Sequence, residues 1–532
     1  MSIHNPYAVS REPVYANGGM VSTSHPLAAQ AGLEVLRAGG NAVDAAVAAA
    51  AALTVVEPTQ NGVGGDAFAL VWDGAELHAL NGSGRSSRQM SYETLGLKPG
   101  DKMKPLGWAG VTVPGAPRAW AEIHKKFGRS EFAPLFTSAI SYARNGYPLS
   151  PVVAEYWRRA QKNMKNHTSK EFQGWYDMFL PDGFNVEAGA MWSSEDLAQT
   201  LEKIAGTRAE DFYTGELAEK IIQFAQNTGG LLCKEDLADY RPEWVQPISA
   251  NYKGYTVWEL PPNNQAIATL LALNILDKME LPTHREEERN IHLQIEAMKL
   301  AFADTLEYVG DCGDDEALIK GLLDLDYADE RRELIGEEAL EPKAGMPKKG
   351  DTVYLAVADK DGMMVSFIQS NYMGFGSGMV VPETGIALHN RGYSFNCNPG
   401  HPNEIGPNKR PYHTIMPGFL TKDGEAVGPF GVMGAFMQPQ GHLQMILNTI
   451  HHKMHPQAAL DAPRWQWVEG KTVRVEQSMS KHVIRSLLSR GHEVIVSPDD
   501  TGFGRGQIIW RLKNKVLVGG SDCRADGQVA AF

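Results

Sequence analysis

The first sixty residues carry an alanine-rich pattern that predicts two consecutive helices. The helical pattern starts near Ser24, is interrupted at Gly39–Asn41, and resumes up to Glu57. Glycine commonly ends a helix, and an asparagine side chain can cap the next one by accepting a backbone N–H. Because the run Ala45–Val56 is apolar on every helical face, we expect a helix that is buried on all sides.

The hydrophobic pattern then changes along the chain. A short apolar strand is expected at Ala67–Trp72, after a glycine-rich segment. Residues 115–345 are mostly helical in pattern and include the amphipathic stretch Ile291–Tyr308. Residues 341–350 contain two prolines, two glycines and three lysines, which is the composition of an exposed linker.

A β-hairpin is predicted directly after this linker. Side chains alternate between two faces over Asp351–Ala358, and a return strand is expected at Met363–Ser370. The turn Asp359–Gly362 between them contains an Asp-Gly pair, which is typical of tight hairpin turns. Elements predicted further along are strands at Gly385–Asn390, Tyr412–Thr421 and around Ile495, Ile508 and Val516, and helices at Gln438–Ile450 and Ser478–Ser489. This order permits a layered α/β/β/α architecture, which periodicity alone does not select.

Composition and charge indicate a globular protein that does not bind nucleic acid. The chain has 532 residues, of which 43% are hydrophobic and 21% charged, as in ordinary globular proteins. Its net charge of −13 argues against nucleic-acid and anionic-membrane partners, which select basic surfaces. The first residues lack the pattern of a signal peptide, and Ala45–Val56 is shorter than the roughly 20 residues that span a bilayer. We therefore expect a cytoplasmic protein.

The cysteines agree with that location. Their wide spacing excludes a CxxC redox or zinc motif and fits free thiols in a reducing compartment. They are Cys233, Cys312, Cys397 and Cys523.

Thr352 is a candidate nucleophile because it lies at the start of the predicted hairpin, after the linker. A threonine hydroxyl needs a neighbouring base, and a free α-amine with a pKa of roughly 7.7–8.0 could serve as one. Such an amine exists at Thr352 only if the bond after Asp351 is cleaved. The alternative is that Thr352 simply starts a strand, where its β-branched side chain favours extended backbone.

Several tracts resemble one family, the γ-glutamyltranspeptidases, and in particular its cytoplasmic, acylase-like branch. Thr352–Tyr354, the turn Asp359–Gly362, Gly374–Gly378 and Glu383–Ile386 look like the start of that family's small subunit. Further matching tracts are GMVSTSHPLAAQAGLEVLRAGGNAVDAAVAAA, VGGDAFALVW, VTVPGAPRAW, HLQIEAMKLAFAD, NKRPYHTIMP and DAPRWQW. They occur in the family's order over nearly the whole chain, which is far more specific than any single motif.

The resemblance implies a proenzyme with the four-layer αββα fold of N-terminal-nucleophile hydrolases. Residues 1–351 would form the large subunit and residues 352–532 the small subunit, and together they would make one globular heterodimer that can assemble further. The Thr352 hydroxyl would attack the Asp351 carbonyl to cleave the chain. The freed Thr352 would then attack a γ-glutamyl amide such as glutathione, giving an acyl-enzyme that water or an amine resolves. The family needs no cofactor or metal.

The resemblance also assigns the catalytic positions. The family's paired-glycine oxyanion loop matches Gly434 and Ala435, where alanine still offers a backbone N–H. Without the resemblance, this loop is an ordinary glycine-rich turn. Ser370 stands where the family has a threonine that hydrogen-bonds the nucleophile. Two positions further on, Tyr372 replaces an asparagine, and the neighbouring Asn371 should point to the opposite face of the strand.

The positions that match the family's substrate contacts are partly changed. Arg85 matches an arginine that binds the substrate carboxylate, with a surface ion pair as the alternative. His413 and Thr414 match a serine pair that touches the same carboxylate. Ser394 stands where an aspartate holds the substrate ammonium, and Arg391 adds a positive charge beside it. We therefore expect an anionic acyl group that need not carry an α-amino group, as in glutaryl amides. The short stretch after Ser394 predicts an open pocket.

Two alternatives to the γ-glutamyl amidohydrolase stay open from the sequence. One is a glutaryl or cephalosporin-type acylase of the same fold, and the other is an unprocessed, non-catalytic binding protein. Two further patterns are set aside. His451, His452 and His455 are interpreted as surface histidines, and Ser478 of an SxxK pattern as the N-cap of its helix.

Overall fold

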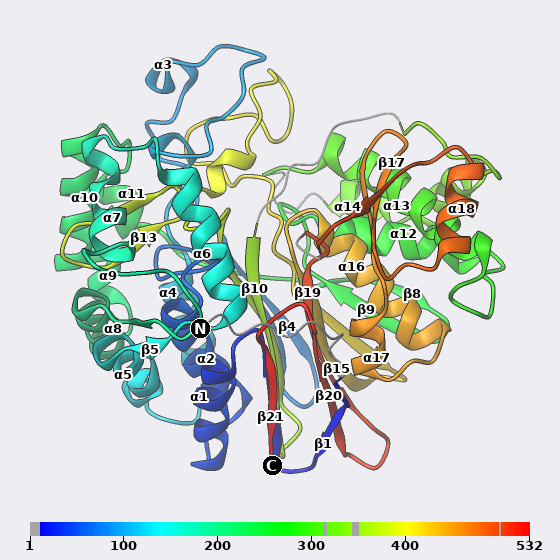
Figure 1. Cartoon of the computed structure of the whole chain (residues 1–532), viewed down its shortest axis with the longest axis horizontal. Coiled ribbons are helices and arrows are strands. Elements are labelled where there is room, and N and C mark those ends of the chain that lie inside the picture. Colours follow the sequence, from blue (N-terminus) through cyan, green and yellow to red (C-terminus); the bar gives the residue numbers. More distant parts are fainter. Residues whose placement is uncertain (1–10, 312–315, 343–350, 500–501) are drawn as a thin grey trace.

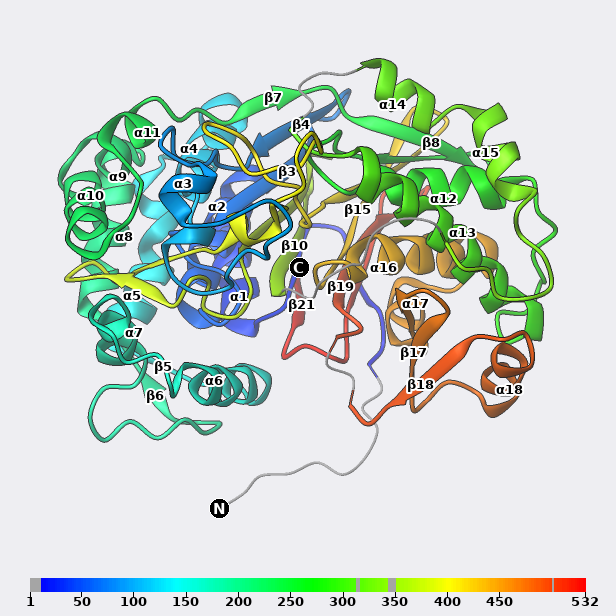
Figure 2. The same ribbon diagram turned by 90° about the horizontal axis from the view of Figure 1, so that it is seen from above.

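The computed structural model describes residues 11–311, 316–342, 351–499 and 502–532 and is built from four layers (Figures 1 and 2). Two seven-stranded sheets lie face to face in the middle, and helices cover the outer face of each. Every strand pairing in both sheets is antiparallel. The expected αββα fold of N-terminal-nucleophile hydrolases is confirmed.

The first sheet has the order β21-β2-β10-β11-β3-β4-β7. Its strands are β21 (Gln528–Ala531), β2 (Gly19–Thr23), β10 (Asp351–Asp359), β11 (Met364–Tyr372), β3 (Asp66–Trp72), β4 (Leu77–Gly82) and β7 (Glu243–Val245). Strands from the two sides of the predicted cleavage point are mixed in this order, since β2 lies between β21 and β10, and β11 pairs with β3. Neither predicted subunit could therefore complete the sheet alone.

The second sheet has the order β1-β20-β19-β15-β14-β9-β8. Its strands are β1 (Val14–Ala16), β20 (Leu517–Ser521), β19 (Arg505–Arg511), β15 (Glu425–Met433), β14 (Gly418–Lys422), β9 (Tyr255–Glu259) and β8 (Ile248–Tyr252). An apolar layer that includes Phe68, Leu70, Tyr354 and Ile509 fills the space between the sheets. Burial of this layer from both sides is the main force that holds the sheets together.

The outer helices belong to two groups. The first sheet is covered by α1 (Pro26–Arg37), α2 (Ala42–Val56) and α4 (Ala116–Phe127), with α5 (Thr137–Asn145) and α8 (Glu195–Thr207) outside them. The second sheet is covered by α12 (Ile267–Asp277), α16 (Met437–Ile446) and α17 (Pro456–Asp461), with α13 (Glu288–Tyr308) and α18 (Lys481–Ser489) further out. No helix of the described residues is long and apolar enough to cross a membrane.

Helix α2 has the predicted start and the predicted burial. The Asn41 side chain accepts the N–H of Asp44, and the Asp44 carboxylate accepts the N–H of Asn41, both at 3.0 Å. Every residue of α2 is buried, and the helix packs on β10 and β11. Because its side chains there are mostly alanine, the helix backbone can approach the sheet closely.

The hairpin predicted after the linker is confirmed as β10 and β11. The Asp359 carboxylate accepts the backbone N–H groups of Asp361, Gly362 and Met363 at 2.9–3.0 Å and so holds the turn. Strand β3 and β13 (Ile386–Leu388) also lie where strands were expected. So does the strand near Ile495, which is β18 (Glu493–Ser497) in a small separate sheet.

Three expectations about single elements were wrong. Helix α13 is buried from Asn290 to Thr305 because it is covered on several sides, so it is not amphipathic. Helix α18 begins after Ser480, which is its N-cap in place of Ser478. Residues 412–417 form no strand, since β14 begins at Gly418. Residues 115–345 are mostly helical as expected, and the short strands β8 and β9 lie within this region. The free thiols of Cys233, Cys397 and Cys523 agree with expectation, and Cys312 lies outside the described residues.

Replacing Asn41 by alanine should lower the free energy of unfolding by about 1–2 kcal/mol, because the first turn of a fully buried helix loses its cap. Urea-induced unfolding measures this change. The control is Ser91→Ala, which removes a cap of the same kind from the four-residue helix α3 (Tyr92–Leu95), a helix without buried residues. An Asn41→Ala effect no larger than the Ser91→Ala effect would contradict the importance of this cap.

Candidate active site

The predicted nucleophile lies near the start of β10, in the hairpin at the centre of the first sheet. Thr352 is the second residue of β10, and the pairs that flank it are Asp351 with Tyr372 and Val353 with Gln369. The register shifts between these two pairs, so Ser370 and Asn371 of β11 lie opposite Thr352. The side chains of Asp351 and Thr352 lie outside the described part of the chain. Ser370 is buried, and its Oγ accepts the Tyr372 N–H at 2.8 Å.

The predicted oxyanion loop follows β15 and has an unusual backbone. Gly434 has a φ of +135° and Ala435 a φ of +49°, which is the left-handed region that a Cβ disfavours. The carbonyl of Ala435 accepts a hydrogen bond from the Gln265 side chain at 2.8 Å. The N–H groups of Gly434 and Ala435 have no acceptor among the described residues. Two adjacent free N–H groups in a fixed loop are suited to hold an oxyanion.

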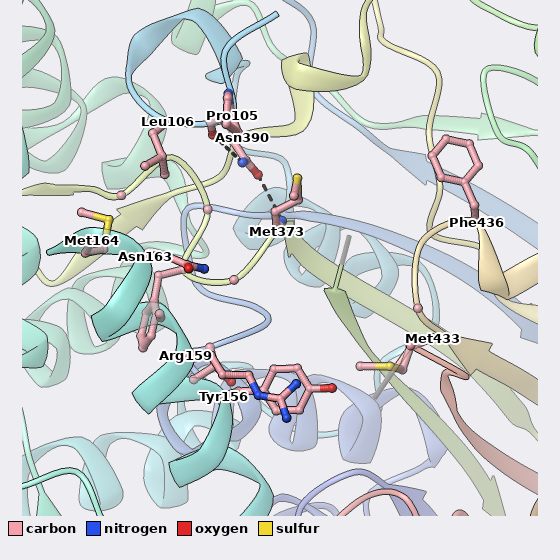
Figure 3. A pocket seen from close by; sticks show the side chains of 18 of the residues that line it. Pro105, Leu106, Tyr156, Arg159, Asn163, Met164, Met373, Asn390, Met433 and Phe436 are labelled. Atoms are coloured by element: carbon pink, nitrogen blue, oxygen red, sulfur yellow. Dashed lines mark hydrogen bonds between the residues drawn. The ribbon is translucent and has the colours of Figure 1, made fainter. Parts of the chain in front are cut away.

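A cavity of about 630 Å³ opens beside this loop (Figure 3). It lies between α6 (Pro151–Met164), the segment after β11 and the loop at Gly434. Asn390 is fixed at its wall, where it accepts the Met373 N–H at 3.1 Å and donates to the Pro105 carbonyl at 2.7 Å. The lining includes Thr59, Tyr156, Arg159, Met164, His167, Met373, Asn390, Met433, Gly434, Phe436, Trp467 and Arg505. This volume is in the range of small-molecule sites.

His413 pairs with a buried carboxylate. Its Nε2 lies 3.1 Å from Asp66 Oδ2, and His389 Nδ1 lies 3.4 Å from the same oxygen. All three side chains are fully buried. Burial and the nearby Arg391 lower the pKa of His413 to about 3, so its ring is neutral. Burial raises the pKa of Asp66, but the contacts with His389 and His413 lower it by more. The pKa of Asp66 is therefore below its ordinary value.

Arg391 is a fully buried cation with an incomplete set of partners. Its Nη1 donates to Thr414 Oγ1 at 2.7 Å, and its guanidinium carbon lies 4.1 Å from the centroid of the Tyr372 ring. Its Nε and Nη2 have no hydrogen-bond partner among the described residues. Burial lowers the pKa of Arg391 to about 10, so the group is still charged at neutral pH. An unpaired buried guanidinium is costly, which makes this position suited to an anionic ligand.

Asn371 and Tyr372 lie on opposite faces of β11, as strand alternation requires. The Asn371 amide is fully buried beside Gly62 and Gly65, and neither its nitrogen nor its oxygen has a partner among the described residues. Tyr372 instead lies beneath Arg391. Asn371 therefore does not take the place of the asparagine that Tyr372 replaces.

Arg85 lies apart from the cavity lining. Its Nη1 is 2.9 Å from Asp311 Oδ2, its Nη2 is 3.5 Å from Glu243 Oε1, and its side chain is 32% exposed. Ser394 donates to the carbonyls of Arg391 and Tyr412 at 2.8 and 2.7 Å and so fixes the loop that carries Arg391. The structure thus brings Arg391, Ser394 and Thr414 together and leaves Arg85 in an ion pair.

Two residues of this region were not singled out from the sequence. Gln265 donates to the carbonyls of Thr414 and Ala435 at 2.7 and 2.8 Å and thereby joins two predicted site segments. Asp66 organises His389 and His413. It lies in the tract VGGDAFALVW, whose family resemblance does not mark this residue, although a carboxylate inside an apolar tract is itself a signal.

One histidine cluster has the composition of a metal site but already holds a cation. Atoms of His292, Glu296 and His492 lie within 4.8 Å of one another. The ammonium of Lys299, however, lies 2.8 Å from Glu296 Oε1, and His292 Nδ1 lies 2.9 Å from His492 Nε2. The Glu296 carboxylate therefore already has a cationic partner. His451 and His455 lie on different helical segments, since His455 caps α17.

Together, the αββα fold and the position of the candidate threonine near the start of a central strand define the class of N-terminal-nucleophile hydrolases. The family model described as gamma-glutamyltranspeptidase matches residues 28–532, and the chain belongs to that family. A "glutathione hydrolase-like YwrD proenzyme" of Bacillus subtilis is 36% identical over 518 residues, covering 96% of this chain and 97% of that protein. An "acylase ACY 1 proenzyme" of a Pseudomonas strain is 33% identical, covering 99% and 96%. The crystal structure of a cephalosporin acylase from Bacillus halodurans is 53% identical, with a TM-score of 0.96 over 100% of this chain and 99% of that one.

Burial of His413 beside Asp66 should make the free energy of unfolding fall as the pH is lowered. The unfolded chain binds a proton at His413 below a pH of roughly 6.5, whereas the native ring stays neutral down to about 3, so acid favours unfolding. In His413→Gln, which keeps a donor for Asp66, the slope of unfolding free energy against pH should fall by about 1.4 kcal/mol per pH unit between roughly pH 6 and 4. The exposed His284, replaced by asparagine, is the control. Equal slopes in His413→Gln and the original protein would refute a neutral His413.

Proposed function

We propose that this protein is a self-processing amidohydrolase that uses Thr352 as an N-terminal nucleophile on amides of small anionic acyl groups, of which γ-glutamyl amides are the first candidates. The family match over residues 28–532 is the observation that carries this proposal. Relatives named as proenzymes support processing into two chains, 1–351 and 352–532. We further propose a cytoplasmic location; the net charge of −13 and the free thiols are consistent with it.

Processing would begin with the Thr352 hydroxyl adding to the Asp351 carbonyl carbon. The C–N bond then breaks, its nitrogen takes up the proton and becomes the Thr352 amine, and the acyl group is held as an ester. Water hydrolyses this ester and leaves a carboxylate on Asp351. The new amine lies on the same residue as the hydroxyl and can accept its proton in the next reaction.

Substrate cleavage would repeat this chemistry on an external amide. The Thr352 hydroxyl attacks the acyl carbon, the oxyanion is held by the N–H groups of Gly434 and Ala435, and the amine product leaves with a proton. Water or a second amine then releases the acyl group. One oxyanion donor contributes roughly 3–4 kcal/mol to such barriers. The Gln265 bond to Ala435 keeps these donors in place before substrate arrives.

A second candidate donor, a glutaryl-type acyl group, is favoured by a specific observation. The Arg391 guanidinium is buried, two of its nitrogens have no partner within the described part of the chain, and Ser394 beside it is neutral. A carboxylate on the acyl group would satisfy the guanidinium, whereas an α-ammonium would meet a like charge. Arg85 is already paired with Asp311 and Glu243. We therefore place the acyl carboxylate at Arg391.

Cleavage before Thr352 should be visible on a denaturing gel. The 58.2 kDa chain should give two fragments of about 38 and 20 kDa, in proportion to their lengths. Thr352→Ala should stay at full length because it lacks the attacking hydroxyl. N-terminal sequencing of the smaller fragment should yield Thr-Val-Tyr-Leu. Active protein that contains only the uncleaved chain would refute the mechanism and favour a non-catalytic role for the processing site.

Arg391→Gln should lower kcat/KM for a glutaryl anilide by roughly 10- to 100-fold, the value of a hydrogen bond to a buried charged group. The γ-glutamyl anilide should lose less, because the variant also removes repulsion of its ammonium. Arg85→Gln is the matched control. It should change kcat/KM only slightly, and by the same factor for both substrates. A larger loss of kcat/KM in Arg85→Gln than in Arg391→Gln would indicate that Arg85, and not Arg391, binds the acyl carboxylate.

A further inference from the structure

The 630 Å³ cavity has two unlike walls (Figure 3). One wall is α6, from which Tyr156, Arg159, Asn163 and Met164 face the cavity. The opposite wall contains Met433 and Phe436, next to Gly434 of the oxyanion loop. Trp467 also lines the cavity. The cavity therefore reaches from the proposed reaction centre to a helix on the far side.

The acyl group does not need this cavity. Arg391, Ser394 and Thr414, which we assign to the acyl carboxylate, are absent from its lining. A volume of this size takes a drug-sized molecule, which is larger than a five-carbon acyl chain. Since the cavity also touches Gly434, the remaining occupant is the amine half of the amide.

The charged residues that line the cavity favour binding of an anionic ligand. Among its described residues the cavity has two arginines, Arg159 and Arg505, and no aspartate or glutamate, in a protein with a net charge of −13. The two arginines differ in their surroundings. Arg505 is buried, lies 3.6 Å from Glu57, and packs over the Tyr156 ring at 4.3 Å. It is therefore already engaged in the wall.

Arg159 is the accessible cation of this wall. Its side chain is 39% exposed and lies 2.9 Å from Glu155, but Glu155 is shared with Arg158 at 2.6 Å. One carboxylate thus serves two guanidinium groups, and the next one, Asp499, is 4.0 Å from Arg159. Arg159 can therefore bind a ligand carboxylate without first giving up an exclusive partner.

The geometry points to a leaving-group subsite in which Arg159 binds a carboxylate on the departing amine. The aromatic and methionine side chains of the cavity bind the apolar part of this amine. This inference rests on the proposed amidohydrolase function. The preferred substrates are then amides between an anionic acyl group and a bulky, carboxylated amine. Arg159 acts on binding of the leaving group, not on the reacting atoms.

Two anilides with the same acyl group test this subsite. Their leaving amines are 4-nitroaniline and 3-carboxy-4-nitroaniline, which differ by one carboxylate. The ratio of their kcat/KM values, carboxylated over neutral, should fall by roughly two- to fivefold in Arg159→Gln, because an exposed ion pair contributes modestly. Arg159→Lys should retain part of the ratio. Lys162→Gln, which removes an exposed cation on the same helix that is absent from the cavity lining, is the matched control and should keep the original ratio.

The outcomes separate this inference from the function on which it rests. Hydrolysis of both anilides with the same ratio in the original protein and in Arg159→Gln would overturn the subsite alone. Hydrolysis of neither anilide by fully cleaved protein would overturn the proposed function and the subsite with it. Appearance of both fragments on a gel shows that each variant has folded. Should Arg159→Gln fail to fold, inhibition of the original enzyme by the two free anilines decides: equal inhibition rejects the subsite.

Discussion

The backbone pairing of β10 with β2 and β11 fixes the point around which the site is arranged. Strand β10 is held by a neighbour on each side, by α2 on one face and by β15 and β19 across the other. The alanines of α2 allow the helix to lie close to the strand. A chain break before Thr352 would therefore leave the strand in place, since only the segment that precedes it is released. The new amine and the hydroxyl of one residue would then stay at a fixed position in the first sheet.

Buried polar groups hold the surrounding loops against this fixed strand. Gln265 ties the carbonyl of Thr414 to that of Ala435, and Asp66 ties His389 to His413. Such networks are stable only when nearly every group is paired, so they allow few alternative loop positions. The strained backbone of Ala435 persists for the same reason. Rigid donors that need no rearrangement during the reaction are the general requirement for stabilising an oxyanion.

The parts that followed from sequence were those set by local rules. The cap at Asn41 and the Asp359 turn depend on neighbouring residues, and both were predicted. The burial of α13 depends on what packs against it, and its own pattern does not contain that information. The partners of Arg85 and Arg391 lie far away in the chain, such as Asp311 for Arg85. Family resemblance could place these arginines by position. Only the three-dimensional contacts reveal that Arg85 is paired, whereas two nitrogens of Arg391 have no partner among the residues that the structure describes.

The two arginines proposed for substrate recognition differ in how strongly each can select. Arg391 is fully buried, so a matching carboxylate gains a strong interaction, and a mismatched group leaves the guanidinium unpaired. Arg159 is partly exposed, so water and salt weaken its preference. We therefore expect high specificity for the acyl half of the amide and low specificity for the amine half. This division fits a family in which one relative is named glutathione hydrolase-like and another cephalosporin acylase, because the leaving-group wall can change without disturbing the strand, the oxyanion loop or the buried acyl site.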